Sequence, residues 1–335
     1  MKKQYLIFLI LPILFLFSCN RDKTPPVLEL PFVNAEIPSV KEDLNEFIDT
    51  SVLKPVITDP GLILNWQKEN WRIQEYEIFS WDIFADTTPI LIFDYADYGV
   101  QNRMLKRLAF YVEKAGFRGQ LWHDSDIAHL HGWNAHNYRD VDLARFFDTA
   151  RKTGFPLLDE EWELEKLLLN EKIIRRENGN IVPGKGAILS IARESTESLR
   201  RRFLAHEGFH GLYFVDNEFR NFCRRRWEGL SEPAKIFLTA YFDHQQYDTK
   251  DEYLLINEFM GHIMQQPISQ AADYFGRNLP SRLENTMRAS DLPPKDNATG
   301  TWPELALAFT SEAQALSDYV NLRWGFTAGR AWSSR

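Results

Sequence analysis

The stretch Arg200–Phe214 reads RRRFLAHEGFHGLYF and holds an H-E-x-x-H pattern at His206, Glu207 and His210. Residues four apart lie on one face of an α-helix, so the two imidazoles can reach the same metal ion. Glu207 lies about 100° further round the helix, where its carboxylate can contact a metal-bound water rather than the ion. The stretch therefore predicts a helix with two metal ligands and a carboxylate beside them.

The chemistry of these side chains fits a catalytic zinc ion. Neutral imidazole is a good zinc ligand, and zinc lowers the pKa of bound water to about 7. A carboxylate beside that water can take its proton and pass it to a leaving amine. An apolar stripe with helical spacing places both histidines on the inward face; its members are Leu199, Phe203, His206, His210 and Tyr213. The alternative is a pair of structural histidines, which would need hydrogen-bond partners in the core.

A catalytic zinc ion usually has three protein ligands and an open position for water, so a third ligand is needed. The segment at residues 251–266, DEYLLINEFMGHIMQQ, has a helical pattern in which Glu258 shares a face with Leu254 and His262. An inward-facing glutamate in an apolar helix needs a partner, and a dication provides one. We therefore expect Glu258 to be the third ligand.

Other carboxylates compete with Glu258 for this role. Asp216 lies six residues after His210, where metzincin-like patterns place their third ligand. Those patterns need a glycine three residues after the second histidine, and Tyr213 occupies that position. Other carboxylates, such as Glu252 near the start of the later helix, are further candidates.

On these residues the chain resembles the gluzincin class of zincin metallopeptidases. The matching features are the strand Ala187–Ala192, the pattern at residues 206–210, and Asn257-Glu258 on a later helix. The resemblance covers about a quarter of the chain and identifies no particular family within the class. It implies that His206, His210 and Glu258 bind one catalytic Zn²⁺ and that Glu207 is the general base and electrostatic stabiliser.

One position departs from the gluzincin pattern. Many gluzincins carry an aspartate four residues after the ligand glutamate, where it orients a zinc-bound histidine, and this chain has His262 there. We expect His262 to be catalytic, by stabilising the oxyanion or by binding substrate. The alternative is that it supports one of the metal ligands.

Composition places the chain among ordinary globular proteins. It has 335 residues, of which 44% are hydrophobic and 26% charged, enough for a substantial core. The net charge is −8 and the isoelectric point about 5.6, which argues against a nucleic-acid partner.

The N-terminus has the pattern of a targeting segment. Lys2 and Lys3 precede an apolar run at residues 5–17 that is too short for a comfortable membrane span. The run ends in Leu-Phe-Ser-Cys, which resembles the lipobox of bacterial lipoproteins and implies cleavage before Cys19 and lipidation of its sulfur. We therefore expect residues 1–18 to be a signal peptide and the rest to be anchored to a bacterial membrane in the cell envelope. The alternative is an ordinary secreted protein.

The remaining patterns predict an α+β fold. Residues 19–60 are expected to form an extended tether or arm, and residues 61–158 an α/β part. Residues 159–335 are expected to form a mainly helical zincin-like part, with one continuous domain from residue 61 as the alternative. Ser195 would cap the helix with the two histidines. The preceding strand, Ala187–Ala192, is expected at the edge of a small mixed sheet, where it could align an extended peptide. The alternative is that this strand lies inside the sheet and has no free edge.

A histidine-rich segment and a lone cysteine complete the candidate residues. Residues 122–138 contain four of the eight histidines: His123, His129, His131 and His136. We interpret the segment as an ordered loop along a substrate cleft, in which Asn137 caps a helix at residues 138–152; a second metal site is the alternative. Cys223 is expected to be a buried, inert thiol.

These expectations combine into a lipid-anchored zinc metallopeptidase that acts on a peptide or protein substrate. Water activated by the ion and by Glu207 would attack the peptide carbonyl. The rival is an inactive lipoprotein that keeps the scaffold to bind a protein or cell-wall partner. A third hypothesis is a hydrolase with the same zinc chemistry whose substrate is a peptidoglycan cross-link.

Overall fold

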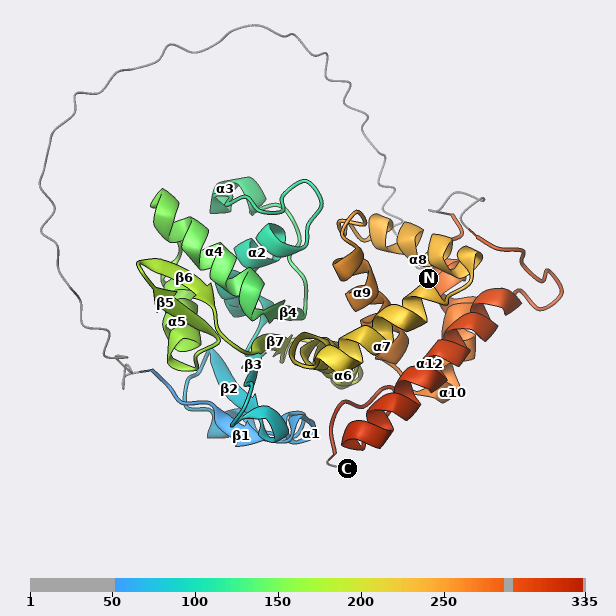
Figure 1. Ribbon diagram of the computed structural model, residues 1–335, viewed down its shortest axis with the longest axis horizontal. Coiled ribbons are helices and arrows are strands. Elements are labelled where there is room, and N and C mark those ends of the chain that lie inside the picture. Colours follow the sequence, from blue (N-terminus) through green and yellow to red (C-terminus); the bar gives the residue numbers. More distant parts are fainter. Residues whose placement is uncertain (1–51, 286–291, 334–335) are drawn as a thin grey trace, which may run out of the picture. The chain divides into compact units, whose positions relative to one another are not determined.

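The computed structural model describes residues 52–285 and 292–333, so Cys19 and the expected signal peptide lie outside the described residues. These described residues belong to one compact unit, in which a mixed five-stranded sheet is joined to a group of helices (Figure 1). Across the sheet, the strands are β1 (Val56–Thr58), β2 (Tyr76–Trp81), β3 (Ile90–Tyr95), β7 (Ala187–Ala192) and β4 (His136–Arg139). The chain thus has the α+β fold that its sequence predicts.

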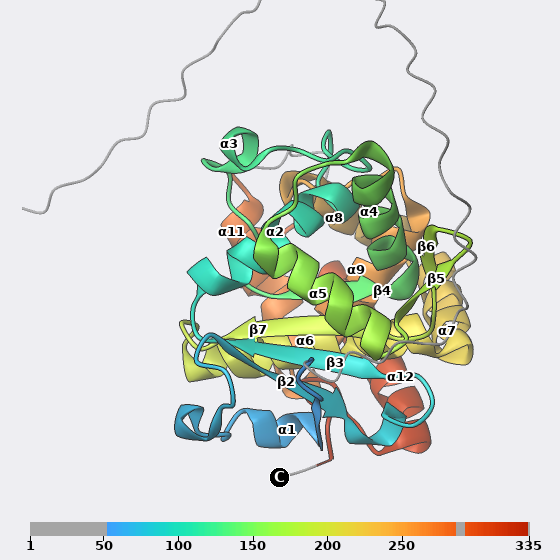
Figure 2. The ribbon, with the colours of Figure 1, turned by 90° about the vertical axis from the view of Figure 1, so that its left-hand side faces the viewer.

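Every residue of β2, β3 and β7 is buried, because helices cover both faces of the sheet. Ile78 and Phe93 pack toward one face, against α2 (Tyr98–Val112), α4 (Asp140–Thr153) and α5 (Asp159–Asn170). Figure 2 shows α4 and α5 together on one side of the strands. Phe79 and Ile92 alternate with these residues and pack on the opposite side, in the core that contains α6 (Glu197–Val215).

The helical part follows α6 along the chain. α6 packs on β7 and also on α9, and therefore lies between the sheet and the remaining helices. Those helices are α7 (Asn217–Glu228), α8 (Glu232–His244), α9 (Glu252–Met264), α10 (Ile268–Asp273), η3 (Tyr274–Asn278), α11 (Leu279–Leu283) and α12 (Pro303–Trp324). Shorter elements are α1 (Pro60–Ile63), η1 (Lys68–Asn70), η2 (Asp82–Phe84), α3 (Asp124–Ile127), and the hairpin of β5 (Ile174–Glu177) and β6 (Asn180–Pro183). None of the described helices is both long and apolar enough to cross a lipid bilayer.

The place of β7 in the sheet differs from the prediction. The strand has the predicted bounds, but it pairs in parallel with β3 and antiparallel with β4, so neither of its edges is free. The edge strand at this end of the sheet is β4, which lies in the histidine-rich segment. The expectation of an edge strand at Ala187–Ala192 is therefore wrong.

Two predicted helix starts also need correction. Asn137 belongs to strand β4 and caps no helix, because α4 begins at Asp140. Thr196, and not Ser195, is the N-cap of α6, where its hydroxyl accepts a hydrogen bond from the Leu199 amide. The predicted apolar stripe of α6 is only partly correct. Leu199 is 37% exposed, and Phe203 and His206 are half-buried. From Leu204 to Tyr213 the rest of the helix is buried on several sides.

Candidate metal centre

The structure brings His206, His210 and Glu258 together from two helices. One donor atom of each side chain lies within 4.8 Å of the other two. The two Nε2 atoms of the histidines are 3.0 Å apart, and the Glu258 carboxylate lies 3.9 Å from His206 Nε2 and 3.8 Å from His210 Nε2. Ligands around a tetrahedral zinc ion are separated by about 3.3 Å, so these distances suit one ion.

The burial of these groups also fits a cation. His210 is 0% exposed and Glu258 is 2% exposed, and Glu258 Oε2 has no hydrogen-bond partner in the described part of the chain. Burial raises the pKa of Glu258 well above its ordinary value, and the nearby charges of Glu113 and Glu207 add to the shift, while a hydrogen bond with Tyr247 opposes it. Burial lowers the pKa of His206 to about 4 and that of His210 well below its ordinary value. Both imidazoles are therefore neutral at pH 7, which is the form that binds metal.

Helix α9 can approach the histidines because it has a glycine at the point of contact. A Cβ atom at Gly261 would lie 2.5 Å from His210 Nε2 and 2.9 Å from His206 Cε1. Any larger residue would fill the space in front of the two imidazoles. Sequence reasoning missed Gly261, although a glycine inside a helical pattern, three residues after a candidate ligand, is a signal for close approach.

Asn257 orients one of the two histidines. Its Oδ1 atom is 2.8 Å from His210 Nδ1, so the ring nitrogen donates to the amide oxygen. This bond places the proton on Nδ1 and leaves Nε2 as the lone-pair donor toward Glu258. The sequence pointed to Asn257 only as the neighbour of the candidate ligand, and its role came from the fold.

Glu207 is held separately from the three donors. Asn137 Nδ2 donates a hydrogen bond of 2.8 Å to Glu207 Oε2, and Glu207 is 4% exposed. Burial raises the pKa of Glu207 to about 8, with a further contribution from the nearby charge of Glu113, while the bond from Asn137 opposes the shift. A dication at the donor group would lower this pKa and favour the carboxylate. Asn137 was expected to be a helix cap, and strand β4 instead directs it at Glu207.

His262 lies next to the donor group but is not part of it. Its Nε2 atom is 3.7 Å from Glu258 Oε2, and its ring centroid is 5.0 Å from that of His206. Its Nδ1 atom is 3.4 Å from Gln265 Nε2. The group of donors within reach of one ion contains His206, His210 and Glu258 without it. Three protein ligands leave a fourth tetrahedral position for water. A catalytic role for His262 stays a prediction.

The other two candidates for the third metal ligand, Asp216 and Glu252, lie outside the donor group. Asp216 is the N-cap of α7, where it accepts a hydrogen bond of 2.7 Å from the Phe219 amide, and it pairs with Arg323 at 2.5 Å. Glu252 is the first residue of α9 and does not belong to the donor group found in the described residues.

The histidine-rich segment forms no metal-binding group within the part of the chain that the structure describes. His136 is buried in β4, where its Nδ1 atom is 2.8 Å from Ser190 Oγ, and burial lowers its pKa to about 3. His123, His129 and His131 are exposed. Cys223 is buried, as predicted, and burial raises its pKa, which suits an inert thiol.

These side chains amount to three donors suited to one divalent cation, two of them buried and His206 partly buried, with a second carboxylate, that of Glu207, held beside them. Compared with known proteins, the chain matches no protein-family model, no curated protein and no solved structure.

Proposed function

We propose that this chain is a zinc-dependent peptidase of gluzincin type. The observation that carries the proposal is the donor group of His206, His210 and Glu258, with Glu207 beside it as a separately held carboxylate. Zn²⁺ bound there would polarise a peptide carbonyl and lower the pKa of water. In this mechanism Glu207 takes the proton of the attacking water and passes it to the leaving amine.

Two further side chains support that chemistry by fixing geometry. Asn137 occupies Oε2 of Glu207, which leaves Oε1 for the proton transfer. Asn257 fixes the tautomer and ring orientation of His210. We assign His262, beside Glu258, to the substrate or oxyanion side of the site.

The substrate would lie along β4 rather than along β7. β4 is an edge strand, and its residue Asn137 contacts the proposed base. A peptide added to this edge in extended form would place its backbone next to Glu207. Binding along a strand edge is made mainly by backbone hydrogen bonds. Both a peptide and the peptide stem of a cell-wall cross-link can therefore bind in this way.

We further propose that the chain acts in the cell envelope, anchored by lipid at Cys19. This part of the proposal rests on the sequence pattern at residues 1–19. Its test is mass spectrometry of the membrane-extracted protein, compared with a Cys19→Ala variant. An unmodified Cys19 would leave only the secreted alternative.

The first experiment measures zinc by elemental analysis on protein that lacks residues 1–19. One zinc per chain is expected in the parent and in Asp216→Ala, and none in Glu258→Ala. Glu207→Gln should keep its zinc and lose peptide hydrolysis, because only the general base is removed. Hydrolysis by Glu207→Gln at the parent rate would end this mechanism.

One observation favours the rival, a non-catalytic binding protein. His210, Glu207 and Glu258 are 0%, 4% and 2% exposed and the His206 side chain is 11% exposed, so the centre offers little surface to a substrate in this conformation. A binding protein would hold zinc as a structural ion and cleave none of the peptides in a broad library. Cleavage that depends on Glu207 would exclude it.

A further inference from the structure

The proposed active site is narrow in this structure, because Glu258 is 2% exposed and the side chains of His206 and His262 are only 11% and 12% exposed. A peptide carbonyl can reach the donor group only if side chains on at least one side of it move away. The centre lies between β4, which holds Glu207 through Asn137, and α9, which contributes Glu258. Several contacts join the region around β4 to the segment that leads into α9.

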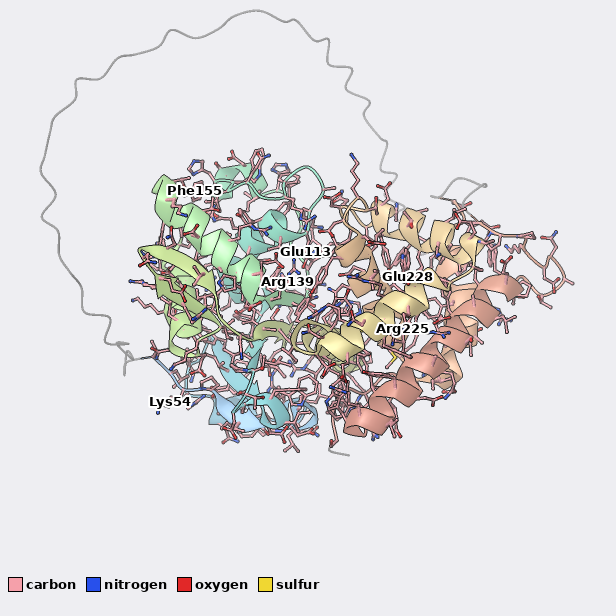
Figure 3. The ribbon with its side chains drawn as sticks, in the orientation of Figure 1. Lys54, Glu113, Arg139, Phe155, Arg225 and Glu228 are labelled. Atoms are coloured by element: carbon pink, nitrogen blue, oxygen red, sulfur yellow. The ribbon has the colours of Figure 1, made fainter. Side chains whose placement is uncertain are left out.

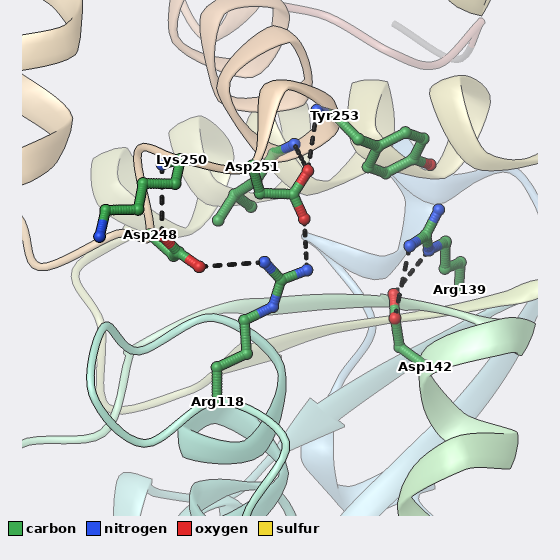
Figure 4. Close-up of polar contacts among 8 residues, drawn as sticks. Arg118, Arg139, Asp142, Asp248, Lys250, Asp251 and Tyr253 are labelled. Carbon is green, nitrogen blue, oxygen red and sulfur yellow. Dashed lines mark hydrogen bonds and ion pairs between the residues drawn. The ribbon is translucent and has the colours of Figure 1, made fainter.

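Arg118 makes the first of these contacts. Its guanidinium pairs with Asp248 at 3.3 Å and forms a second, shorter ion pair with Asp251 (Figure 4). Asp251 is also the N-cap of α9 and accepts hydrogen bonds from the amides of Tyr253, at 2.9 Å, and Leu254, at 3.3 Å. Arg118 thus ties the loop after α2 to the first turn of the helix that carries Glu258.

Two aromatic contacts lie beside this ion pair. The rings of Trp133 and Tyr247 stack with centroids 5.4 Å apart and planes 16° from parallel. The guanidinium of Arg139, the last residue of β4, lies 4.0 Å above the ring of Tyr253. Arg139 is labelled in Figure 3 on the side of the α/β part that faces the helices, together with Glu113. We call the contacts of Arg118, Trp133 and Arg139 with residues 247–253 the α9 latch.

We propose that the α9 latch is a gate, which holds the site shut and must open before a substrate can reach the donor group. This inference concerns the regulation of the proposed peptidase site and rests on that function for its biological meaning. The two ion pairs of Arg118 suit a gate because they are partly exposed to solvent. The side chains of Arg118, Asp248 and Asp251 are 28%, 31% and 22% exposed, so solvent screens their attraction and salt weakens it.

The gate can be tested on metal-free protein that lacks residues 1–19, by the rate at which diethylpyrocarbonate modifies individual histidines. Neutral imidazoles react with this reagent, and mass spectrometry separates the sites. Exposed His131 should react fast in the parent, and His206 and His262 slowly. Arg118→Gln should raise the rates at His206 and His262 about three- to tenfold, because it removes both ion pairs of the latch.

Arg323→Gln is the matched control. Arg323 also pairs with two carboxylates, Asp216 and Glu218, but these lie at the start of α7 and outside the latch. Its removal should leave the rates at His206 and His262 unchanged. Alkylation of buried Cys223 reports unfolding, and its rate should stay low in both variants. In the parent, 0.5 M salt should raise the modification rates at His206 and His262 as Arg118→Gln does. In the Arg118→Gln variant, the same salt should raise these rates little further.

Three results would overturn the gate. These are equal rates in the parent and in Arg118→Gln, an equal rise in Arg323→Gln, and a parent in which His206 reacts as fast as His131. Because the readout needs neither zinc nor activity, it is independent of the proposed function. If the chain binds no zinc but gives the expected rates, the gate is supported and the proposed peptidase function is refuted.

Discussion

Asn137 Nδ2 donates a hydrogen bond of 2.8 Å to Oε2 of Glu207, and this bond joins the edge strand β4 to the helix that carries both histidines. It fixes the carboxylate that we assign as the general base. The bond is made between buried side chains, so its loss also leaves Glu207 without a partner in a water-poor site.

The first prediction concerns this bond. Asn137→Ala should lower kcat of peptide hydrolysis by about 10- to 100-fold, with a smaller change in KM, because Glu207 loses its orientation but the donor group stays intact. Zinc content should stay at one per chain. Steady-state kinetics and elemental analysis check this, with Asn134→Ala as a control in the same segment. A parallel loss of zinc in Asn137→Ala would show that the residue supports the metal site rather than the base.

Asn257 gives the second prediction. Asn257→Ala should weaken zinc binding by about 10- to 100-fold, because the His210 ring loses the acceptor that fixes its tautomer. Asn257→Asp should retain most of the affinity, since a carboxylate can accept the same hydrogen bond. Competition with a chelator of known affinity measures both variants. Equal affinities for the parent and for Asn257→Ala would refute the orienting role.

The third prediction uses the close approach at Gly261. Gly261→Ala would place a Cβ atom 2.5 Å from His210 Nε2, so α9 must shift or the imidazole must turn away. We expect zinc stoichiometry near zero and a loss of about 1–3 kcal/mol in the free energy of unfolding. Gly229→Ala is the control, because the nearest atom to its new Cβ would be 3.4 Å away. Thermal unfolding and elemental analysis check both variants.

The fourth prediction is a pH dependence of the metal-free protein. Glu113 is 6% exposed, and burial raises its pKa from 4.5 to about 8; Glu207 has a pKa of about 8 for the same reason. Between pH 6.5 and 8 the folded chain retains protons on these groups that the unfolded chain has already lost. Stability must therefore fall as pH rises through this window, up to the folded pKa. Histidines with lowered pKa values, such as His136, act in the opposite direction only below about pH 6.5.

Differential scanning calorimetry in the presence of a chelator measures this effect. The midpoint of thermal unfolding should drop by about 5 °C between pH 6.5 and 8. Glu113→Gln should reduce the drop, because a neutral amide stays uncharged across the window. A midpoint that is constant or rises in the parent would contradict the assigned shifts.

The sequence by itself determined the local features of this protein. Helical spacing places His206 and His210 on one face of α6, and the apolar pattern around Glu258 predicts the helix α9 that carries it. The chemistry of an inward-facing glutamate favoured Glu258 over Asp216, and the structure brings Glu258 to the two histidines. These inferences succeed because a helix is set by residues within a few positions of each other, and ligand chemistry is a property of residue type.

Only the tertiary structure decided which segments meet around that helix. The strand Ala187–Ala192 has its predicted bounds, yet β4 pairs with it and takes the edge position. His136 and Ser190, which face each other across these two strands, are 54 residues apart in the chain. The same pairing directs Asn137 at Glu207, and the packing of α9 on α6 decides that only glycine fits at position 261. Strand order and helix contacts arise from backbone pairing and core packing between distant segments, and a local pattern of residues does not encode which distant partner each segment will have.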